Sequence, residues 1–195
     1  QPALKWSSQH RQHHQFTDTD RDPYNINRGF WYAHMNWILL YKHRVNYGNV
    51  PDLQKSKLVM SQHHLYSLWS VGGGILLPLL IGFLIGHPLG SFIMAVCLRL
   101  VLVIHSAFFI NSYAHMFGTR NYDRTISARD NWLGAILTNG EGYHNFHHRF
   151  PNDYRNGIRW HDWDPSKWII FSLSKLGWTW DLKKTPQSMI DTSWS

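Results

Sequence analysis

The chain has 195 residues, a formal net charge of +7 and one cysteine, Cys97, so we expect a single domain over residues 1–195 without an internal disulfide. A lone cysteine also argues against a thiolate metal site, which leaves the 14 histidines to carry any metal chemistry. The basic excess suits anionic lipid, a phosphate-bearing substrate or nucleic acid. Nucleic acid is excluded as a partner because long apolar runs occupy the centre of the chain and no recognition motif is present.

The first polar part, residues 1–67, contains the triplet His10, His13 and His14. Offsets of three and four residues place side chains on one face of a helix, and neutral imidazole is a common metal ligand. The triplet alone is equally compatible with a polar, histidine-rich helix end. Because the sequence begins at Gln1 rather than at a methionine, we expect the natural chain to carry further residues before it.

Two further helices are expected before the apolar centre. Residues 29–43 are predicted to form an amphipathic helix of about four turns, which is too short and too polar to span a bilayer. It could lie on a membrane surface with Lys42 and Arg44 at its end. These two cations could then meet the phosphates of CoA or of lipid headgroups. Residues 53–66 are also expected to be helical.

Residues 68–86 and 89–110 form two apolar stretches, and the first contains no charged residue. Each has the length of a membrane-spanning helix, about 20 residues, and the short break between them suits a tight turn. The alternative is a pair of buried helices in a soluble protein. The glycines at 72–74 and Pro78 favour the membrane, because membrane helices tolerate such residues better. We therefore predict a membrane hairpin over residues 68–110.

The basic residues are distributed as a two-span hairpin requires. Residues 1–67 carry eight Lys and Arg and residues 114–195 carry ten, which leaves Arg99 as the nineteenth. A hairpin returns the chain to the side that it left, so those 18 residues lie on one side, which the positive-inside rule assigns to the cytoplasm. Arg99 lies within the second stretch, where a charge costs about 2.5–3.5 kcal/mol. It must therefore snorkel or meet a polar partner.

The remaining residues, 111–195, hold four more candidate ligands. Asn111 precedes one of them, His115, by four residues, so the two are predicted to share a helix face, with Asn111 holding a metal through water. Two triplets exceed the ligand number of one tetrahedral zinc, which points to a two-metal site or to two separate sites. The four candidates are His115 and a second triplet with the spacing of the first, His144, His147 and His148.

Three shorter features lie in the same part of the chain. Glu141 could orient one of the histidines, a frequent role of carboxylates beside metal ligands, or could be only an acid at a helix start. Ser127 and Asp130 are predicted to cap a helix over residues 132–137. Residues 166–176 are expected to form a helix that serves packing.

Several segments together carry a family resemblance. They are HRQHH at residues 10–14, Asp22-Pro23, Arg28-Gly29-Phe30, NSYAH at residues 111–115 and EGYHNFHHRFPNDYRNG at residues 141–157. With these motifs nearly the whole chain resembles the membrane fatty acyl desaturases, and most of all the Δ9 type that acts on acyl-CoA, such as stearoyl-CoA desaturase. The resemblance implies an all-α fold of four spans with a cytosolic helical cap that carries a histidine-rich di-iron site.

The resemblance also implies which residues serve that site. Asn111 would act through water, and Trp6 would line a tunnel for the acyl chain. The family has a further histidine motif upstream, HxxxxH, which this sequence lacks together with the first two spans. We therefore expect a partial chain that is inactive alone. The implied iron ligands within it are His10, His13, His14, His115, His144, His147 and His148.

The implied reaction is the O2-dependent insertion of a cis double bond, at the Δ9 position, into a saturated chain carried as acyl-CoA or acyl-lipid. Two iron ions are the implied cofactors, and an acidic electron donor such as cytochrome b5 or a ferredoxin would suit the basic face. The implied location is the endoplasmic reticulum or the bacterial inner membrane, as a multi-pass protein with its histidines on the cytoplasmic side. Ala107 stands where animal enzymes carry a tunnel threonine, which leaves chain length and double-bond position open. A fatty acyl or alkane hydroxylase on the same scaffold, or a non-catalytic membrane metal-binding protein, are the alternatives.

Overall fold

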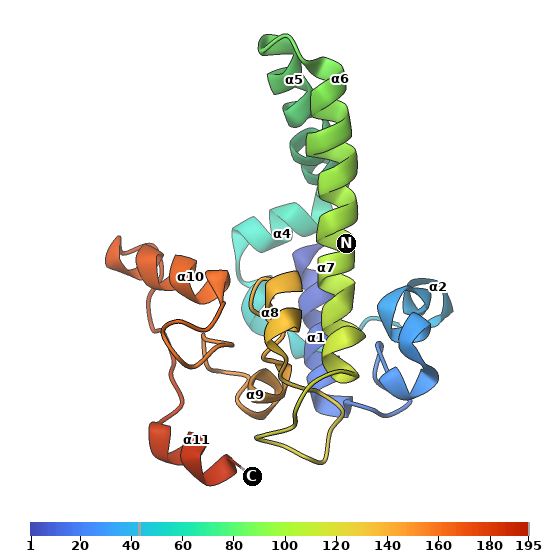
Figure 1. Ribbon diagram of the computed structural model, residues 1–195. Coiled ribbons are helices and arrows are strands. Elements are labelled where there is room, and N and C mark those ends of the chain that lie inside the picture. Colours follow the sequence, from blue (N-terminus) through green and yellow to red (C-terminus); the bar gives the residue numbers. More distant parts are fainter. Residues whose placement is uncertain (43, 195) are drawn as a thin grey trace. The chain divides into compact units, whose positions relative to one another are not determined.

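The computed structural model describes residues 1–42 and 44–194, and the regular structure within them is helical (Figure 1). Within these ranges the only β-type pairing consists of isolated bridges, and no strand forms. The all-α prediction is therefore confirmed. The chain forms two compact units, which we call the first unit (Gln1–Gln15 with Tyr41–His105) and the second unit (Phe16–Leu40 with Ser106–Ser195). The single domain over residues 1–195 stays a prediction.

Helix α1 (Ala3–Phe16) supplies the N-terminal part of the first unit. Between its ends the sequence has no glycine, proline or β-branched residue, the types that disfavour helix formation most. Side chains of α1 bind the segment after Tyr41. Arg11 forms a bidentate pair with Asp52, with both nitrogen-to-oxygen distances 2.7 Å, and the Ser8 hydroxyl donates to the carbonyl oxygen of Asn46 at 2.8 Å.

The helix expected over residues 53–66 is interrupted in the structure. A short turn η3 (Tyr47–Asn49) and helix α3 (Pro51–Gln54) precede helix α4 (Lys57–His64). Ser56 separates the two α-helices because its hydroxyl accepts a hydrogen bond from the backbone N–H of Val59 and so caps α4. Serine at this position is a strong helix start signal.

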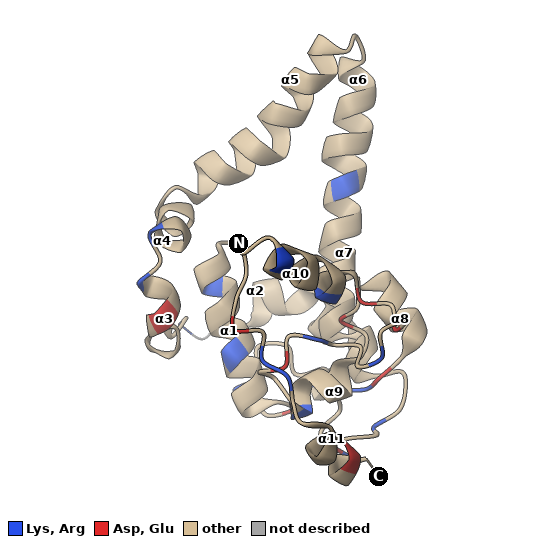
Figure 2. Cartoon of the chain, turned by 90° about the vertical axis from the view of Figure 1, so that its left-hand side faces the viewer, with Lys and Arg blue, Asp and Glu red and all other residues tan. Residues whose placement is uncertain are grey.

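The two apolar arms pack against each other in the first unit, to which the second arm belongs as far as His105. The first arm is η4 (Leu68–Leu76) followed by α5 (Leu77–Leu84), and the second is α6 (Pro88–Ser91), η5 (Phe92–Leu98) and α7 (Arg99–Asn111). Both η4 and η5 have wide π-helical turns. The arms meet closely beside the turn, where the Ser91 hydroxyl donates to the carbonyl oxygen of Pro78 at 2.6 Å, and they separate further from it (Figure 2).

One helix among the described residues, Pro88–His115, is long and apolar enough to cross a membrane. The first arm meets the same criteria only when it is joined to Lys57–His64, from which it is bent by 83°. Arg99 in the second arm has the polar partners that its position requires, since its guanidinium donates to the carbonyl oxygens of Ala95 and Gly74, each at 2.7 Å. A hairpin of two spans stays a prediction.

The second unit begins with the turn η1 (Ile26–Arg28) and the helical segment η2 (Tyr32–Asn36) and α2 (Trp37–Leu40). Its buried face carries Tyr32, Ala33, His34 and Trp37, whereas Ile38 to Leu40 are exposed. The predicted helix over residues 29–43 was therefore too long, because the regular structure ends at Leu40. Tyr41 belongs to the first unit, where its hydroxyl accepts a hydrogen bond from Gln12 at 2.6 Å. His43 of the predicted helix lies outside the described residues.

The remaining helices of the second unit are short, apart from one. They are η6 (Tyr113–His115), α8 (Trp132–Leu137), α9 (His144–Arg149), α10 (Pro165–Lys175) and α11 (Gln187–Ser193). Helix α10 confirms the helix expected at residues 166–176. Asp164 caps it by accepting from the N–H of Lys167 at 2.9 Å, while its other oxygen accepts from the N–H groups of Asn156 and Gly157.

Helix α8 forms where it was expected, but its cap was assigned wrongly. Asn131 is the capping residue, and its side-chain oxygen accepts from the N–H groups of Leu133 and Gly134 at 2.9 and 3.1 Å. Ser127 and Asp130 bind elsewhere in the unit. The sequence pattern misled because both residues find partners far along the chain, which a local capping motif does not reveal.

Candidate metal site

Helix α9 is held in the second unit by two residues that the sequence analysis did not single out as site residues. Asp130 caps its first turn, with Oδ1 accepting from the N–H groups of Asn145 and Phe146 at 2.8 and 3.1 Å. The Asn145 side chain, which is fully buried, accepts from the N–H groups of Tyr122 and Asp123. Its amide donates to the carbonyl oxygens of Asp123 and Ala128. The polar segment before α8, residues 118–131, which we call the connector, is thereby bound to α9.

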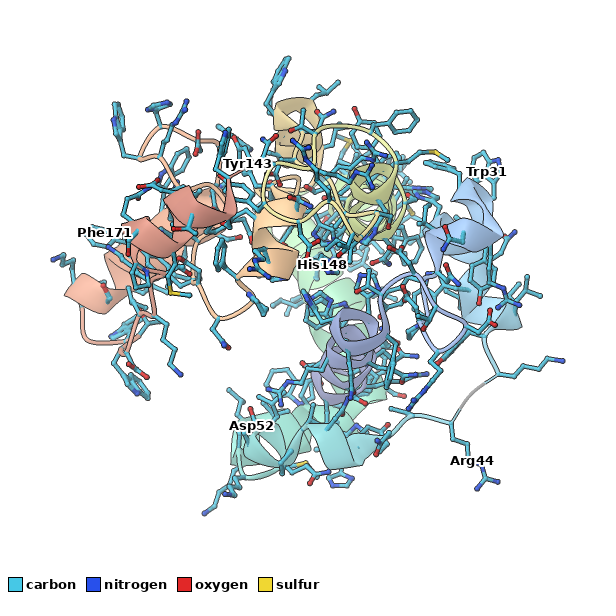
Figure 3. The ribbon with its side chains drawn as sticks, turned by 90° about the horizontal axis from the view of Figure 1, so that it is seen from below. Trp31, Arg44, Asp52, Tyr143, His148 and Phe171 are labelled. Atoms are coloured by element: carbon cyan, nitrogen blue, oxygen red, sulfur yellow. The ribbon has the colours of Figure 1, made fainter. Side chains whose placement is uncertain are left out.

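The histidines of the second unit converge on the same helix. His115, His144 and His148 each offer one ring nitrogen, and these nitrogens all lie within 4.8 Å of one another. The Nε2 atoms of His144 and His148 are 3.1 Å apart. His144 is completely buried and His115 nearly so. His147, one turn after His144, stacks beside it with ring centroids 5.6 Å apart. Figure 3 shows His148 on this helix.

Such an arrangement fits a transition metal. Imidazole nitrogens suit iron, zinc, copper and nickel, whereas oxygen-preferring cations such as Mg²⁺ and Ca²⁺ select carboxylates and carbonyls. Burial also removes competing water from the ring nitrogens of His115 and His144. The second unit therefore presents three convergent ligand atoms of one chemical type, which could hold a metal ion.

Helix α1 displays the first triplet as the sequence predicted. The Nε2 atoms of His10 and His14 lie 3.2 Å apart, and the ring centroid of His13 is 5.8 Å from that of His14. Trp6 lies one turn before His10 and stacks on it, with ring centroids 4.6 Å apart and ring planes inclined by 12°. The indole, which is about half exposed, thus extends the histidine face with an aromatic surface.

We expected Asn111 and His115 to share a face of one regular α-helix, but the structure places them in two separate elements. Helix α7 ends at Asn111, and after Ser112 the chain tightens into η6, which contains His115. The Ser112 hydroxyl bonds back to the carbonyl oxygen of Phe108 at 2.9 Å, which competes with continuation of the helix. His115 therefore joins the other histidines from a separate turn. The proposed water-mediated role of Asn111 stays a prediction.

Lys42 and Arg44 lie beyond the last helical residue, Leu40, and both are exposed. The prediction that they end the amphipathic helix was wrong, because the chain leaves α2 at Leu40. Figure 3 shows the Arg44 side chain extending away from the helices. Both cations are accessible to a phosphate group, and that role stays a prediction.

Glu141 has a different partner from the one that we expected. Its carboxyl is hydrogen-bonded to Asn156 and lies near Asp164, and burial raises its pKa to about 7. Burial likewise raises the pKa of Asp130 to about 7, against the hydrogen bonds from Phe146 and Asn145, which lower it. Contact of Glu141 with a histidine stays a prediction.

The raised pKa of Glu141 predicts a pH dependence of stability. The folded protein keeps a proton that the unfolded chain, with an ordinary pKa of 4.5, has released by pH 7. The free energy of unfolding should therefore fall as the pH rises from about 4.5 to 7. Glu141→Gln has no proton to lose and should keep its free energy of unfolding over this range. At pH 8, with a chelator present to remove metal ions, its thermal unfolding midpoint should therefore exceed that of the wild type by roughly 5 °C. At pH 4.5 the two midpoints should agree. A constant difference across this range would contradict the assignment.

Comparisons with known proteins place these residues in a family context. The family model described as "Fatty acid desaturase" matches residues 1–178. The probable acyl-CoA desaturase of Schizosaccharomyces pombe is 43% identical over 188 residues, which cover 95% of this chain and 39% of the relative. Acyl-CoA desaturase 1 of Saccharomyces cerevisiae is also 43% identical, over 97% of this chain and 38% of the relative. The stearoyl-CoA desaturase of Sus scrofa is 36% identical, over 96% and 54%.

Proposed function

The chain belongs to the fatty acid desaturase family, and we propose that it forms part of a membrane di-iron enzyme that inserts a cis double bond, at Δ9, into a saturated acyl chain. The chain spans between 38% and 54% of the length of the three relatives named above, so the activity proposed is that of the whole protein. The convergence of His115, His144 and His148 carries the proposal. Acyl-CoA is the proposed substrate form because the relatives are named acyl-CoA and stearoyl-CoA desaturases.

We propose that the two histidine triplets and His115 jointly bind two irons. Each triplet has two ring nitrogens within 3.2 Å of each other on one helix, which supports a ligand role for both. The chain also links them closely: Thr17, whose hydroxyl lies 3.5 Å from Nδ1 of His148, follows His14 by only three residues. The proposed ligands are His10, His13, His14, His115, His144, His147 and His148, with Asn111 acting through water.

The chemistry explains why a metal centre is needed. An unactivated methylene has no acidic proton, so general acid–base groups alone cannot remove its hydrogens. Two irons held by these histidines would supply the chemistry by which O2 accepts two hydrogens of the acyl chain, two electrons from a donor and two protons, and so becomes two molecules of water. The residues of this chain hold and orient the imidazoles. Trp6 is stacked on His10 and offers an aromatic surface. We propose that the acyl chain lies against this surface, beside the metal site.

The charges of the chain suggest its partners. Lys42 and Arg44 are exposed and could bind the phosphates of CoA or of lipid headgroups. With a net charge of +7, the protein would attract an acidic electron donor such as cytochrome b5 or a ferredoxin. Reduction of O2 to water takes four electrons. The acyl chain provides two of them, and the donor supplies the other two.

We propose that the arms η4–α5 and α6–α7 are two spans of a multi-pass protein, with both triplets in the cytoplasm. No Lys, Arg, Asp or Glu lies between residues 68 and 98, and Figure 2 accordingly draws both arms tan on either side of their turn. A cysteine introduced at His87, in a Cys97→Ala background, should react with an impermeant thiol reagent only from the lumenal or external side. Labelling from the cytoplasmic side would overturn the hairpin.

The activity test uses the complete gene product that contains this sequence. The iron-loaded protein receives an electron donor, O2 and a saturated acyl-CoA, and the products are analysed by mass spectrometry. We expect a mono-unsaturated product two hydrogens lighter than the substrate. A product heavier by one oxygen would identify a hydroxylase instead. Two bound irons with neither product would show a non-catalytic metal-binding protein.

A further inference from the structure

We propose that Asp18 and Ser127 are positioning residues that set the tautomer of His115, and with it the nitrogen that His115 offers to a metal. The inference deepens the proposed function, because it rests on His115 being an iron ligand. All three residues belong to the second unit, although Asp18 and Ser127 are 109 positions apart.

The three side chains form a continuous chain of hydrogen bonds. The Ser127 hydroxyl donates to Oδ1 of Asp18 at 2.5 Å, and the Ser127 backbone N–H donates to Oδ2 of the same carboxylate at 2.7 Å. On its other side, the oxygen of the Ser127 hydroxyl lies 2.7 Å from Nδ1 of His115. One serine therefore connects a carboxylate to a candidate metal ligand.

The number of protons in this chain determines the direction of its last hydrogen bond. A serine hydroxyl has a single hydrogen to donate, and an ionised carboxylate can only accept. Since the Ser127 hydrogen is used toward Asp18, its oxygen can only accept from His115. Nδ1 of His115 must then carry the ring proton, so the lone pair of the neutral imidazole is on Nε2. A metal needs that lone pair.

Asp18 has an uncommon backbone conformation, which orients its carboxylate. Asp18 has a φ of +66°, in the left-handed region that non-glycine residues seldom adopt. Two side chains hold it there: the amide of Asn27 donates to the carbonyl oxygen of Asp18 at 2.9 Å, and Asp22 accepts from its N–H at 3.0 Å. A conformation of this kind persists only where its surroundings impose it, and such positions are frequent at functional sites.

A second serine–histidine pair in the same unit shows what distinguishes the first. Nδ1 of His34 lies 2.9 Å from the hydroxyl of Ser112, which donates to the main-chain carbonyl oxygen of Phe108. The His34 ring packs between aromatic rings, with that of Phe30 stacked on it at 5.5 Å. Here the Ser112 hydroxyl donates to a neutral carbonyl, and the His34 ring packs against aromatic side chains. At His115 the Ser127 hydroxyl donates to a carboxylate, and the ring lies beside other imidazoles.

The variant Asp18→Asn tests the direction of the chain with little change of shape. The Ser127 N–H needs an acceptor, so the amide oxygen of Asn should face it and the amide NH2 should face the Ser127 hydroxyl. The hydroxyl then donates to Nδ1 of His115, and the ring proton moves to Nε2. We expect the affinity for one of the two metals to fall by about 10–100-fold, the range for residues that orient metal ligands.

Two variants of the serine complete the series. Ser127→Ala removes the hydrogen bond without inverting it, so its loss of affinity should be smaller than that of Asp18→Asn. Ser127→Thr keeps the hydroxyl and should bind metal like the wild type. Thr125→Ala is the matched control: the Thr125 hydroxyl also donates to a carboxylate, that of Asp123, in the same connector. It should leave metal affinity unchanged.

Affinity is measured on the complete protein by anaerobic titration of Fe²⁺, and of Co²⁺ for its visible spectrum, against a chromophoric chelator. The expected order of loss is Asp18→Asn, then Ser127→Ala, then Ser127→Thr. Wild-type affinity in Asp18→Asn would overturn the proposal. An equal loss of metal affinity in Thr125→Ala would also overturn it. So would a loss of metal affinity that parallels, across all variants, the fall in the thermal midpoint of the metal-free protein, because either result would indicate a purely structural role. Failure of the proposed function shows separately, as absence of unsaturated product from the iron-loaded wild type.

Discussion

Replacing His144 with alanine is expected to lower the iron content of the protein and to reduce desaturation more than about 100-fold. His144 is completely buried, and its Nε2 lies 3.1 Å from that of His148. Loss of a residue that only orients a ligand costs about 10–100-fold in metal affinity or activity, so loss of the ligand itself should exceed this range. Iron per protein by elemental analysis and product by mass spectrometry measure the two effects.

His161→Ala provides the matched control for this experiment. His161 lies in the same unit and is exposed, and its ring stands nearly perpendicular to that of Trp160, with ring centroids 5.3 Å apart. Its replacement should leave both iron content and turnover near the wild-type values. If His144→Ala bound as much iron as the wild type, His144 would have to be removed from the ligand set.

Gly142→Ala is the second change with a large expected effect. A Cβ atom at this position would lie 2.0 Å from the backbone nitrogen of Ala135 and 2.2 Å from the carbonyl carbon of Gly134. Both atoms belong to the main chain of α8, so no side-chain rotation can relieve the clash. We expect the free energy of unfolding to fall by about 3 kcal/mol or more. Iron should be lost as well, because Gly142 precedes His144 by two residues.

The effect of Gly142→Ala is measured by denaturant unfolding of the metal-free protein together with its iron content after reconstitution. Gly73→Ala is the control, since a Cβ atom at Gly73 would meet nothing within 4 Å. It should change stability by no more than about 1 kcal/mol, the difference in helix propensity between the two residues. Wild-type stability in Gly142→Ala would show that α8 and the segment before α9 are not packed as closely as described.

Features that depend on short offsets along the chain were predictable. The HxxHH spacing predicts a histidine face on a helix, and α1 and α9 confirm it with Nε2 distances of 3.2 and 3.1 Å. The helix expected over residues 166–176 forms as α10, where Pro165 stands in the first turn and Asp164 caps it. Offsets of three and four residues correspond to one turn of α-helix, so such contacts need no knowledge of the rest of the fold.

Predictions failed where a residue had a distant partner. The helix expected over residues 29–43 ends at Leu40, because Tyr41 already belongs to the first unit, where Gln12 binds its hydroxyl. The expected capping pair, Ser127 and Asp130, is used instead on Asp18 and on the first turn of α9. In each case a side chain chooses among several acceptors or donors, and only the folded chain decides which of them are within reach.

The sequence by itself therefore determined the fold class, imidazole as the candidate ligand type, and membership of a desaturase family, which the match over residues 1–178 confirms. Only the tertiary structure decided what holds these imidazoles. It showed Asn145 and Asp130 fastening α9, and it showed Ser127 joining His115 to Asp18 across 109 positions. Helix periodicity is a local property of the chain, whereas a hydrogen bond between distant residues requires a backbone path that no local pattern records.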